Sequence, residues 1–346
     1  MKFETFTKGQ MFIQEHPEYE FLKTHERLGG NICLLGYGGS IAYGTNTPES
    51  DIDIRGIAIN PARDILIGKD FEQVCNTETD TTVYSLNKMI HLLTQCNPNT
   101  IEILGLKPEH YIVCNYIGRE LLDKKGMFLS KECYKTFGGY AYAQLRRLDN
   151  KSARELGAEQ HEAHVMHSIE CAVNSFKDRY GLEMFEYIKL SVDTVDGEPT
   201  VFADICLDHR PLRDFYGMYQ EMFNIMRDYD KLGKRNKSAI TRGKLGKHQM
   251  HLVRLLMMCI DILEKHEIIT YREEEHDLLM SIRNGIFLTE YNQPTEDFDR
   301  LVAQYKSRMD EAYKKSTLPD KPDLDKIHEL QREINESVVL DDYYRD

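Results

Sequence analysis

Apolar and polar positions change their spacing along the chain, and this change separates a mixed N-terminal part from a mainly helical remainder. Short apolar or β-branched runs predict strands and other short elements, at residues 32–35, 51–59, 81–84, 101–106 and 111–113. Helical spacing predicts helices at residues 8–28 and 86–96. The second of these helices should end at Asn97-Pro98, because a residue before proline disfavours the helical region.

Beyond residue 131 the spacing is mostly helical. It predicts helices at residues 134–148, 158–178, 211–227, 248–265, 273–284, 295–316 and 324–336. Two alternating runs flank the turn sequence V-D-G-E-P and predict a hairpin insertion near 187–206. We therefore expect an α/β domain with a small mixed sheet at residues 1–125, followed by a mainly helical domain at 126–346.

The composition argues against several classes of protein. The 346 residues are 41% hydrophobic and 29% charged, which is typical of a globular protein, and no apolar run reaches the ~20 residues of a membrane span. The N-terminus has no apolar signal region, so we expect a cytoplasmic protein that does not associate with a membrane, located in the host cell if a phage encodes it. None of the eight cysteines forms a C-x-x-C pair, which gives no support to a zinc or redox motif.

Charge is distributed unevenly. The formal net charge of −13 disfavours an indiscriminate nucleic-acid binder. Residues 231–247 nevertheless hold seven Lys or Arg and no acidic residue. This stretch is either a solvated loop or a lid or groove for phosphates, which a triphosphate or an acceptor nucleic acid would supply.

The most informative chemistry lies between residues 33 and 59. A buried strand is followed by glycines that break it and allow close approach of the backbone, and Ser40 then begins a short helix. Free N–H groups at a helix start attract phosphate. The D-I-D sequence that follows places Asp51 and Asp53 on one face of an extended segment, where a cation would relieve their repulsion. A phosphate cradle beside a carboxylate pair indicates a nucleoside triphosphate held with Mg²⁺.

This segment resembles the signature of the DNA polymerase β superfamily of nucleotidyltransferases. More narrowly, G-S-I-A-Y-G-T-N-T-P-E-S-D-I-D-I-R-G is similar to a bacterial and phage group in that superfamily, with Gly-Ser, ten residues and then D-I-D. Further segments are similar to the same group, at residues 80–93, 97–104, 246–256 and 318–323. The resemblance is weakest over residues 130–240.

The resemblance implies roles for individual residues. Asp51 and Asp53 would be metal ligands for Mg²⁺ or Mn²⁺, and Gly39 and Ser40 would hold the β and γ phosphates. A third carboxylate usually comes from a neighbouring strand, where it completes a metal site and accepts the acceptor's proton. Asp80 is our first choice because it begins the D-T-T-V-Y strand; the alternatives are Glu78 and Glu102.

Three cationic side chains follow one face of the predicted helix at 248–265. Lys247, His251 and Arg254 are spaced i, i+4 and i+7, which indicates a clamp for the triphosphate or pyrophosphate. The alternative is a face paired with acids of the first domain. Arg55 likewise either faces the site or pairs with a carboxylate.

Two further groups of residues stay open. Asn97 and Tyr43 are candidates for the nucleotide pocket. His161, His164 and His167 drift around a helix, which favours polar packing over a zinc site.

The sequence therefore predicts a metal-dependent nucleotidyltransferase that moves a nucleoside monophosphate from an NTP to an acceptor and releases pyrophosphate. The acceptor is either an RNA 3′ end, such as that of tRNA, or a protein hydroxyl. The alternatives are a nucleotide-binding regulator without turnover and an enzyme that modifies a small molecule. The base of the NTP and the oligomeric state do not follow from the sequence.

Overall fold

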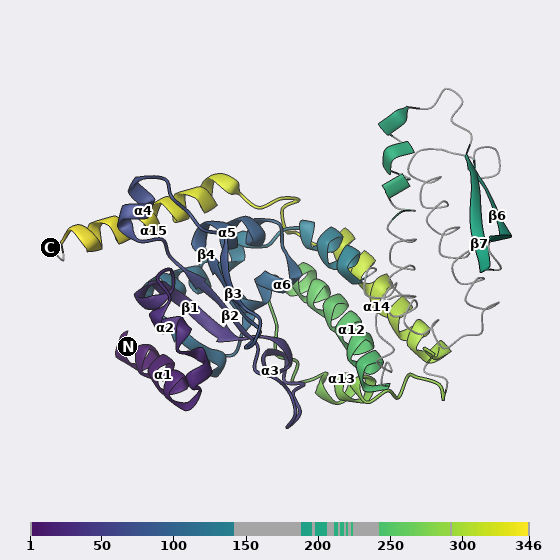
Figure 1. Ribbon diagram of the computed structural model, residues 1–346, viewed down its shortest axis with the longest axis horizontal. Helices are drawn as coiled ribbons and strands as arrows, with labels where there is room; N and C mark the ends of the chain where they lie inside the picture. Colours follow the sequence, from purple (N-terminus) through teal and green to yellow (C-terminus); the bar gives the residue numbers. More distant parts are fainter. Residues whose placement is uncertain are drawn as a thin grey trace. The chain divides into compact units, whose positions relative to one another are not determined.

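The fold was determined as a computed structural model (Figure 1). It describes residues 2–141, 188–195, 198–205, 211–213, 215–217, 219, 220, 223, 242–290 and 293–344. The chain forms two compact units. The first contains residues 1–145, 246–286 and 296–346, and the second contains residues 146–245 and 287–295. The first unit thus contains both the N-terminal part of the chain and later helices. The domain division at residue 125 stays a prediction.

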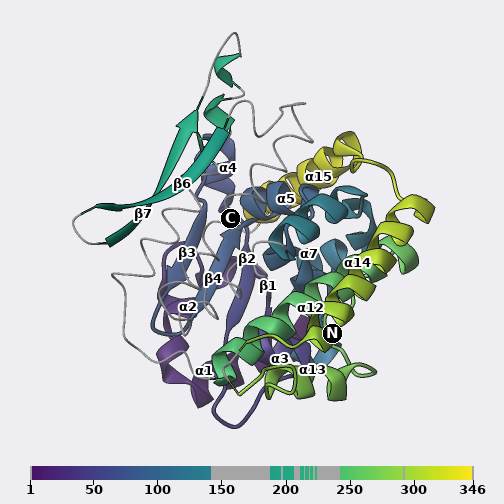
Figure 2. The same cartoon turned by 90° about the vertical axis from the view of Figure 1, so that its right-hand side faces the viewer.

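A five-stranded mixed sheet lies at the centre of the first unit (Figure 2). Its strand order is β3-β4-β2-β1-β5, and only β2 and β4 run parallel. The strands are β1 (Ile32–Tyr37), β2 (Ile54–Ala58), β3 (Gln73–Asn76), β4 (Thr81–Ser85) and β5 (Tyr111–Cys114). The prediction of a small mixed sheet with helices is confirmed.

One face of this sheet carries an apolar core beneath the N-terminal helices. Ile54 and Val83 project from neighbouring strands and pack with Phe12, Tyr19 and Leu22. Side chains alternate between faces along a strand, so the residues flanking Ile54 point to the opposite face. Asp53 and Arg55 therefore lie on the face away from this core.

Helices surround the sheet and extend the first unit. The N-terminal ones are α1 (Lys2–Glu15), α2 (Phe21–Thr24), α3 (Gly39–Tyr43), α4 (Ala62–Leu66), α5 (Leu86–Thr94), α6 (Pro98–Ile101) and α7 (Tyr116–Asp123). Short 3-10 turns join them at Pro17–Tyr19, Gly29–Asn31, Glu102–Gly105, Pro108–His110 and Lys125–Phe128. Residues 132–141 are also helical.

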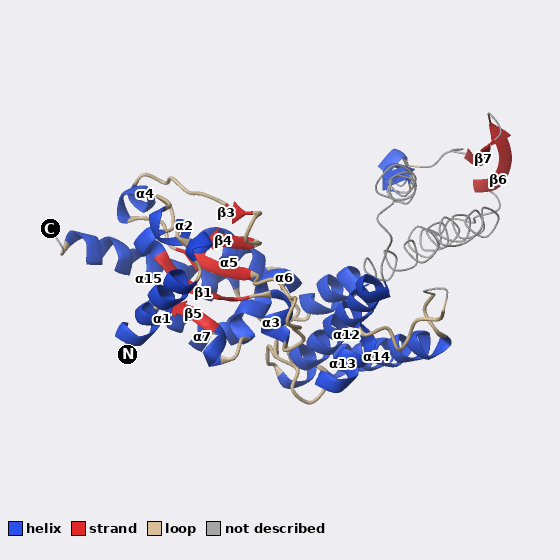
Figure 3. Ribbon diagram, turned by 60° about the horizontal axis from the view of Figure 1, so that its bottom comes forward, coloured by secondary structure: helices blue, strands red, loops and turns tan. Residues whose placement is uncertain are grey.

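The later helices are α12 (Arg242–Lys265), α13 (His276–Arg283), α14 (Glu296–Lys315) and α15 (Leu324–Tyr343). The side chains of α12 are buried from Leu252 to Leu263. An ion pair between Arg308 and Glu264, at 2.7 Å, joins α14 to α12, and Figure 3 shows these helices side by side. No helix in the described part of the chain is long and apolar enough to cross a membrane.

In the second unit, strands β6 (Ile188–Val195) and β7 (Glu198–Ile205) form an antiparallel pair. Ile188 lies opposite Ile205, and Val195 lies opposite Glu198. The two paired strands lie where the hairpin was predicted, and its place as an insertion in a helical domain stays a prediction. The predicted helix at 158–178 lies outside the described residues, as do residues 142–148 of the one predicted at 134–148.

Two predictions about the N-terminal elements need correction, and two elements were missed. The D-I-D residues precede β2, which begins only at Ile54. The segment at 8–28 is not one helix, because α1 ends at Glu15, two residues before Pro17, whose ring cannot continue an α-helix. Helix α4 and strand β3 were not predicted at all.

Candidate functional site

The Gly-Gly-Ser turn lies against Asp53. The Gly38 N–H donates a hydrogen bond to the backbone oxygen of Asp53, at 2.8 Å. Gly39 has a φ of +54°, and a Cβ atom added there would overlap Oδ2 of Asp53. Only glycine satisfies both constraints at position 39. The turn thus brings its backbone directly onto a carboxylate, and Ser40 is buried just behind it in α3.

Asp53 and Asp80 are brought together by the parallel pairing of β2 with β4. Ile54 lies opposite Thr81, so each aspartate immediately precedes its strand. Asp80 has a φ of +42°, and its backbone oxygen accepts a hydrogen bond from the Ile54 N–H at 3.4 Å. Strand order thus places the two carboxyl groups side by side, although 26 residues separate them.

The pKa values of the two aspartates in this pair are shifted in opposite directions. Burial, followed by the hydrogen bond and the negative charge of Asp80, raises the pKa of Asp53 to about 6. The same hydrogen bond from Asp53 lowers the pKa of Asp80, and the charge of Arg55 lowers it further. Below about pH 6 the pair therefore holds one proton between its two facing carboxyl groups, which is the behaviour of like charges held too close to ionise independently.

Arg55 is the counter-ion of Asp80. Its Nη2 lies 3.2 Å from Oδ1 of Asp80, and its Nη1 donates to the Asp80 backbone oxygen at 2.5 Å. Nη1 also donates to the backbone oxygen of Ile54 at 2.9 Å. These contacts match the interpretation in which Arg55 pairs with a carboxylate.

Lys247 also acts on this pair from α12. Its side chain is exposed, and its positive charge lowers the pKa of Asp80 and opposes the rise in the pKa of Asp53. The structure therefore brings together Gly39, Asp53, Asp80 and Lys247, four of the predicted site residues. An exposed ammonium group beside two carboxylates remains accessible to an anionic ligand.

The other predicted acids lie differently. Asp51 is exposed and precedes β2, and Glu78 is exposed in the turn before β4. Within the described residues, no three His, Cys, Asp or Glu side chains form a cluster suited to a metal ion. The structure thus assembles two of the three expected carboxylates, and the role of Asp51 as a metal ligand stays a prediction.

Arg254 and His251 face a separate buried group. Arg254 is 1% exposed, and its Nη1 lies 3.1 Å from Oε2 of Glu102. Its guanidinium lies 3.4 Å from the centroid of the Tyr43 ring, and its Nη2 lies 3.1 Å from Nδ1 of His251. Tyr43 donates its hydroxyl to Glu102 at 2.8 Å. This is the pairing with an acid that the alternative interpretation of the cationic face expects.

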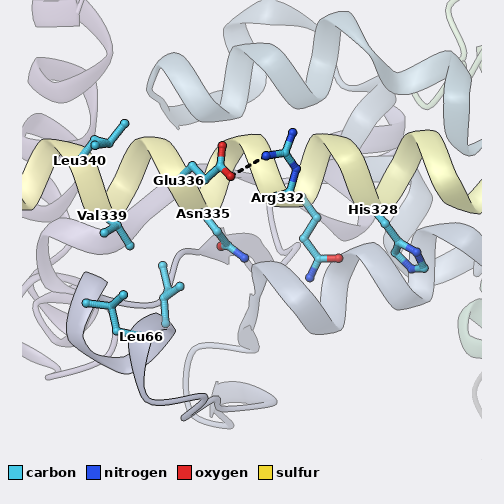
Figure 4. Close-up of a pocket in the computed structure, with 9 residues that line it drawn as sticks. Leu66, His328, Arg332, Asn335, Glu336, Val339 and Leu340 are labelled. Carbon is cyan, nitrogen blue, oxygen red and sulfur yellow. Dashed lines mark hydrogen bonds and ion pairs between the residues drawn. The ribbon is translucent and has the colours of Figure 1, made fainter.

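A narrow internal cavity touches both groups of residues, because Gly38, Arg55 and Glu102 all line it. A second depression lies elsewhere, between α4 and α15 (Figure 4). It is mainly apolar, and Leu66, Val339 and Leu340 contribute to it. None of the predicted site residues lines this groove. His161, His164 and His167 lie outside the described residues.

The mixed sheet, with the Gly-Gly-Ser turn held against a carboxylate, is consistent with the fold of a polymerase β-like nucleotidyltransferase. The sequence model of the family described as "RlaP: RNA repair pathway DNA polymerase beta family" matches residues 13–169, and this match supports that class. The narrower resemblance to the group with the Gly-Ser and D-I-D signature stays a prediction.

One relative comes from Enterobacteria phage T4. It is an uncharacterised 38.9 kDa protein encoded in the nrdC-mobD intergenic region, and it is 30% identical over 131 residues. The alignment covers 34% of this chain and 39% of the phage protein, so the two share well under half of their lengths. No solved structure matches the chain significantly.

Proposed function

We propose that this protein transfers a nucleoside monophosphate from an NTP to an acceptor hydroxyl and releases pyrophosphate. The observation that carries the proposal is the contact of the Gly39 backbone with the carboxylate of Asp53, which in turn faces Asp80. A nucleotide bound at the turn would place its phosphates beside both acids. Phosphoryl chemistry needs this proximity, because charge neutralisation and alignment supply most of the catalysis.

The acids of the site fit a divalent cation. Carboxylate oxygens are ligands for Mg²⁺ and Mn²⁺, and a cation held between two facing carboxylates would offset their mutual repulsion. Asp53 and Asp80 would hold the ion, with Asp51 as a proposed further ligand. When bound, the ion would supply Lewis-acid stabilisation of charge on the transferring phosphorus.

The remaining residues have roles that follow from their positions. Gly39 and Ser40 would hold the phosphates through the backbone and the hydroxyl. Lys247 would bind the triphosphate or the departing pyrophosphate as a point charge. Arg55 would maintain the orientation of Asp80 through its two contacts with that residue.

For the acceptor, we propose an RNA end. The description of the matched family names an RNA repair pathway, and residues 231–247 carry seven basic residues and no acidic one. A basic segment of this kind binds phosphates without reading sequence. A protein hydroxyl or a small molecule as acceptor would be a different outcome of the same experiment.

The test is incubation of the purified protein with each α-labelled NTP, Mg²⁺ or Mn²⁺, and either total RNA or total protein. We expect label in RNA, and we expect none with the Asp53→Asn protein. Label in protein or in a small molecule would show that this molecule, and not RNA, is the acceptor. Tight NTP binding without any transfer would support the nucleotide-binding regulator instead.

A further inference from the structure

Arg254 is a buried charge whose contacts are all internal. Its side chain is 1% exposed and lies between Glu102, Tyr43 and His251. Arginine cannot accept a hydrogen bond, so Nδ1 of His251 accepts from Nη2, and any ring proton on that histidine is on Nε2. A phosphate could reach this guanidinium only if Arg254 left Glu102. Direct contact with substrate therefore does not explain why a charge is buried here.

Glu102 links Arg254 to helix α3, which begins with the Gly39–Ser40 turn. It accepts the Tyr43 hydroxyl with both carboxylate oxygens, at 2.8 and 3.0 Å. Burial, opposed by the charge of Arg254, raises the pKa of the Tyr43 hydroxyl, which therefore stays protonated and donates. Tyr43 is the last residue of α3, and Gly39 is the first. One short helix thus joins the buried ion pair to the turn that lies against Asp53.

The segment from α12 to α13 contacts the end of α3 at several more points. The Arg272 N–H donates to the backbone oxygen of Tyr43 at 3.3 Å, and Arg283 donates to the backbone oxygen of Thr45. Gly44, at a φ of +74°, has no room for a side chain because the ring of Tyr271 covers it. These contacts hold the C-terminal end of α3 from the side of α12.

A second buried ion pair fixes the loop that makes these contacts. Arg272 is 2% exposed and pairs with Asp261 of α12, which also lies 2.9 Å from Lys265. Thr270 of the same loop donates its hydroxyl to the backbone oxygen of Glu102 at 2.8 Å. Loop, helix and Glu102 therefore form one continuous support behind α3.

We propose that Arg254 is a positioning residue, which holds α3 in place through Glu102 and Tyr43 and thereby sets the Gly39–Ser40 turn at the carboxylate pair. It does not touch the substrate. The catalytic consequence rests on the proposed function, whereas the mechanical consequence does not. Helix α3 has only five residues and little stability of its own, so its position depends on such tertiary contacts.

The test begins with Tyr43→Phe, which removes one hydroxyl and retains the ring under Arg254. Tyr134→Phe is the matched control, because the Tyr134 hydroxyl also donates to a carboxylate, that of Asp310 in α14 at 2.8 Å, and not to a residue that supports α3. Hydrogen exchange of the backbone amides of residues 39–45 is compared in both variants. We expect about two- to tenfold faster exchange in Tyr43→Phe alone, the equivalent of one hydrogen bond.

Kinetics supply the second readout. In Tyr43→Phe, we expect kcat/KM for the NTP to fall about two- to tenfold, with KM for the acceptor unchanged. The double variant with Arg254→Lys should lose little more than Arg254→Lys alone, because both changes break the same chain of contacts. Multiplicative losses would overturn the proposal and would indicate that Arg254 binds phosphate directly.

The two proposals fail in different ways. Equal exchange at residues 39–45 in Tyr43→Phe and Tyr134→Phe would overturn the positioning role even if transfer is normal. Wild-type protein that does not transfer nucleotides would refute the proposed function. The exchange measurement would still decide whether Arg254 and Glu102 hold α3.

Discussion

Replacing Asp53 with asparagine should make the metal-free protein more stable while it removes the response to Mg²⁺. Asp53 faces Asp80, and its pKa is raised from an ordinary value of 3.8 to about 6. A carboxyl group with a raised pKa stabilises the fold while it is protonated, and this contribution is lost as the pH rises through about 6. Above that pH the wild-type protein contains two facing charges, whereas the variant contains one.

The size of the gain follows from this pKa. Each pKa unit corresponds to about 1.4 kcal/mol, so an isolated site would gain about 3 kcal/mol at pH 7.5. The real gain is smaller, because the pKa of Asp80 moves the opposite way and its side chain is 64% exposed. We expect about 1 kcal/mol after this discount, or roughly 2 °C in melting temperature.

The assay is thermal unfolding of wild type and variant between pH 4 and 8, with EDTA and then with Mg²⁺. The advantage of Asp53→Asn should be full at pH 7.5, shrink as the pH falls through about 6, and vanish near the ordinary pKa of 3.8. Mg²⁺ should raise the melting temperature of the wild type but have little effect on the variant, because a ligand stabilises only the state that binds it.

Asp70→Asn is the matched control with the opposite sign. Burial raises the pKa of Asp70, but hydrogen bonds from Asn60, Asn87 and the Phe71 N–H hold it below its ordinary value overall. The same substitution there should lower stability at pH 7.5. If metal-free Asp53→Asn melts below wild type at pH 7.5, the facing carboxylates do not repel each other and the reasoning is refuted.

Three other substitutions distinguish the residues of the site. Lys247→Ala should weaken NTP affinity about tenfold to a hundredfold in a titration at constant metal concentration, with an unchanged melting temperature. Unchanged affinity would show that Lys247 does not bind the NTP. Arg254→Ala should instead destabilise the fold by about 3 kcal/mol or more in urea unfolding, because it leaves the largely buried carboxylate of Glu102 without its counter-ion. A loss below about 1 kcal/mol would contradict this. Gly39→Ala should abolish NTP binding measured by calorimetry, since its methyl group would overlap Asp53 and its backbone has φ +54°, and normal binding would show that the turn can shift.

Local patterns were sufficient to predict much of the fold. The apolar run before Gly36 predicted β1, the β-branched T-T-V-Y sequence predicted β4, and alternation on both sides of V-D-G-E-P predicted the hairpin. Elements with weak local signals were missed. Strand β3 has alternating exposed and half-buried residues at the sheet edge, and α4 has only five residues. For both, the packing partner rather than the sequence pattern determines the structure.

The candidate site was also predicted only where a local pattern reports it. Asp80 was chosen because it begins a strand next to the D-I-D strand, and the parallel register brings it to Asp53. The spacing of Lys247, His251 and Arg254 correctly placed all three on one helix, but spacing cannot show what lies opposite each side chain. Glu102 meets Arg254 across 152 positions of sequence, so no local pattern reports that contact.

The central claim is nucleotidyl transfer from an NTP at the Asp53–Asp80 pair, and the position of the label in ATP tests it most directly. Parallel reactions with α-labelled and γ-labelled ATP, Mg²⁺ and RNA should place the α label in RNA and release the γ label as pyrophosphate. Both signals should disappear in Asp53→Asn. If the γ label appears in the acceptor, or if the α label enters RNA equally well with Asp53→Asn, the account is contradicted.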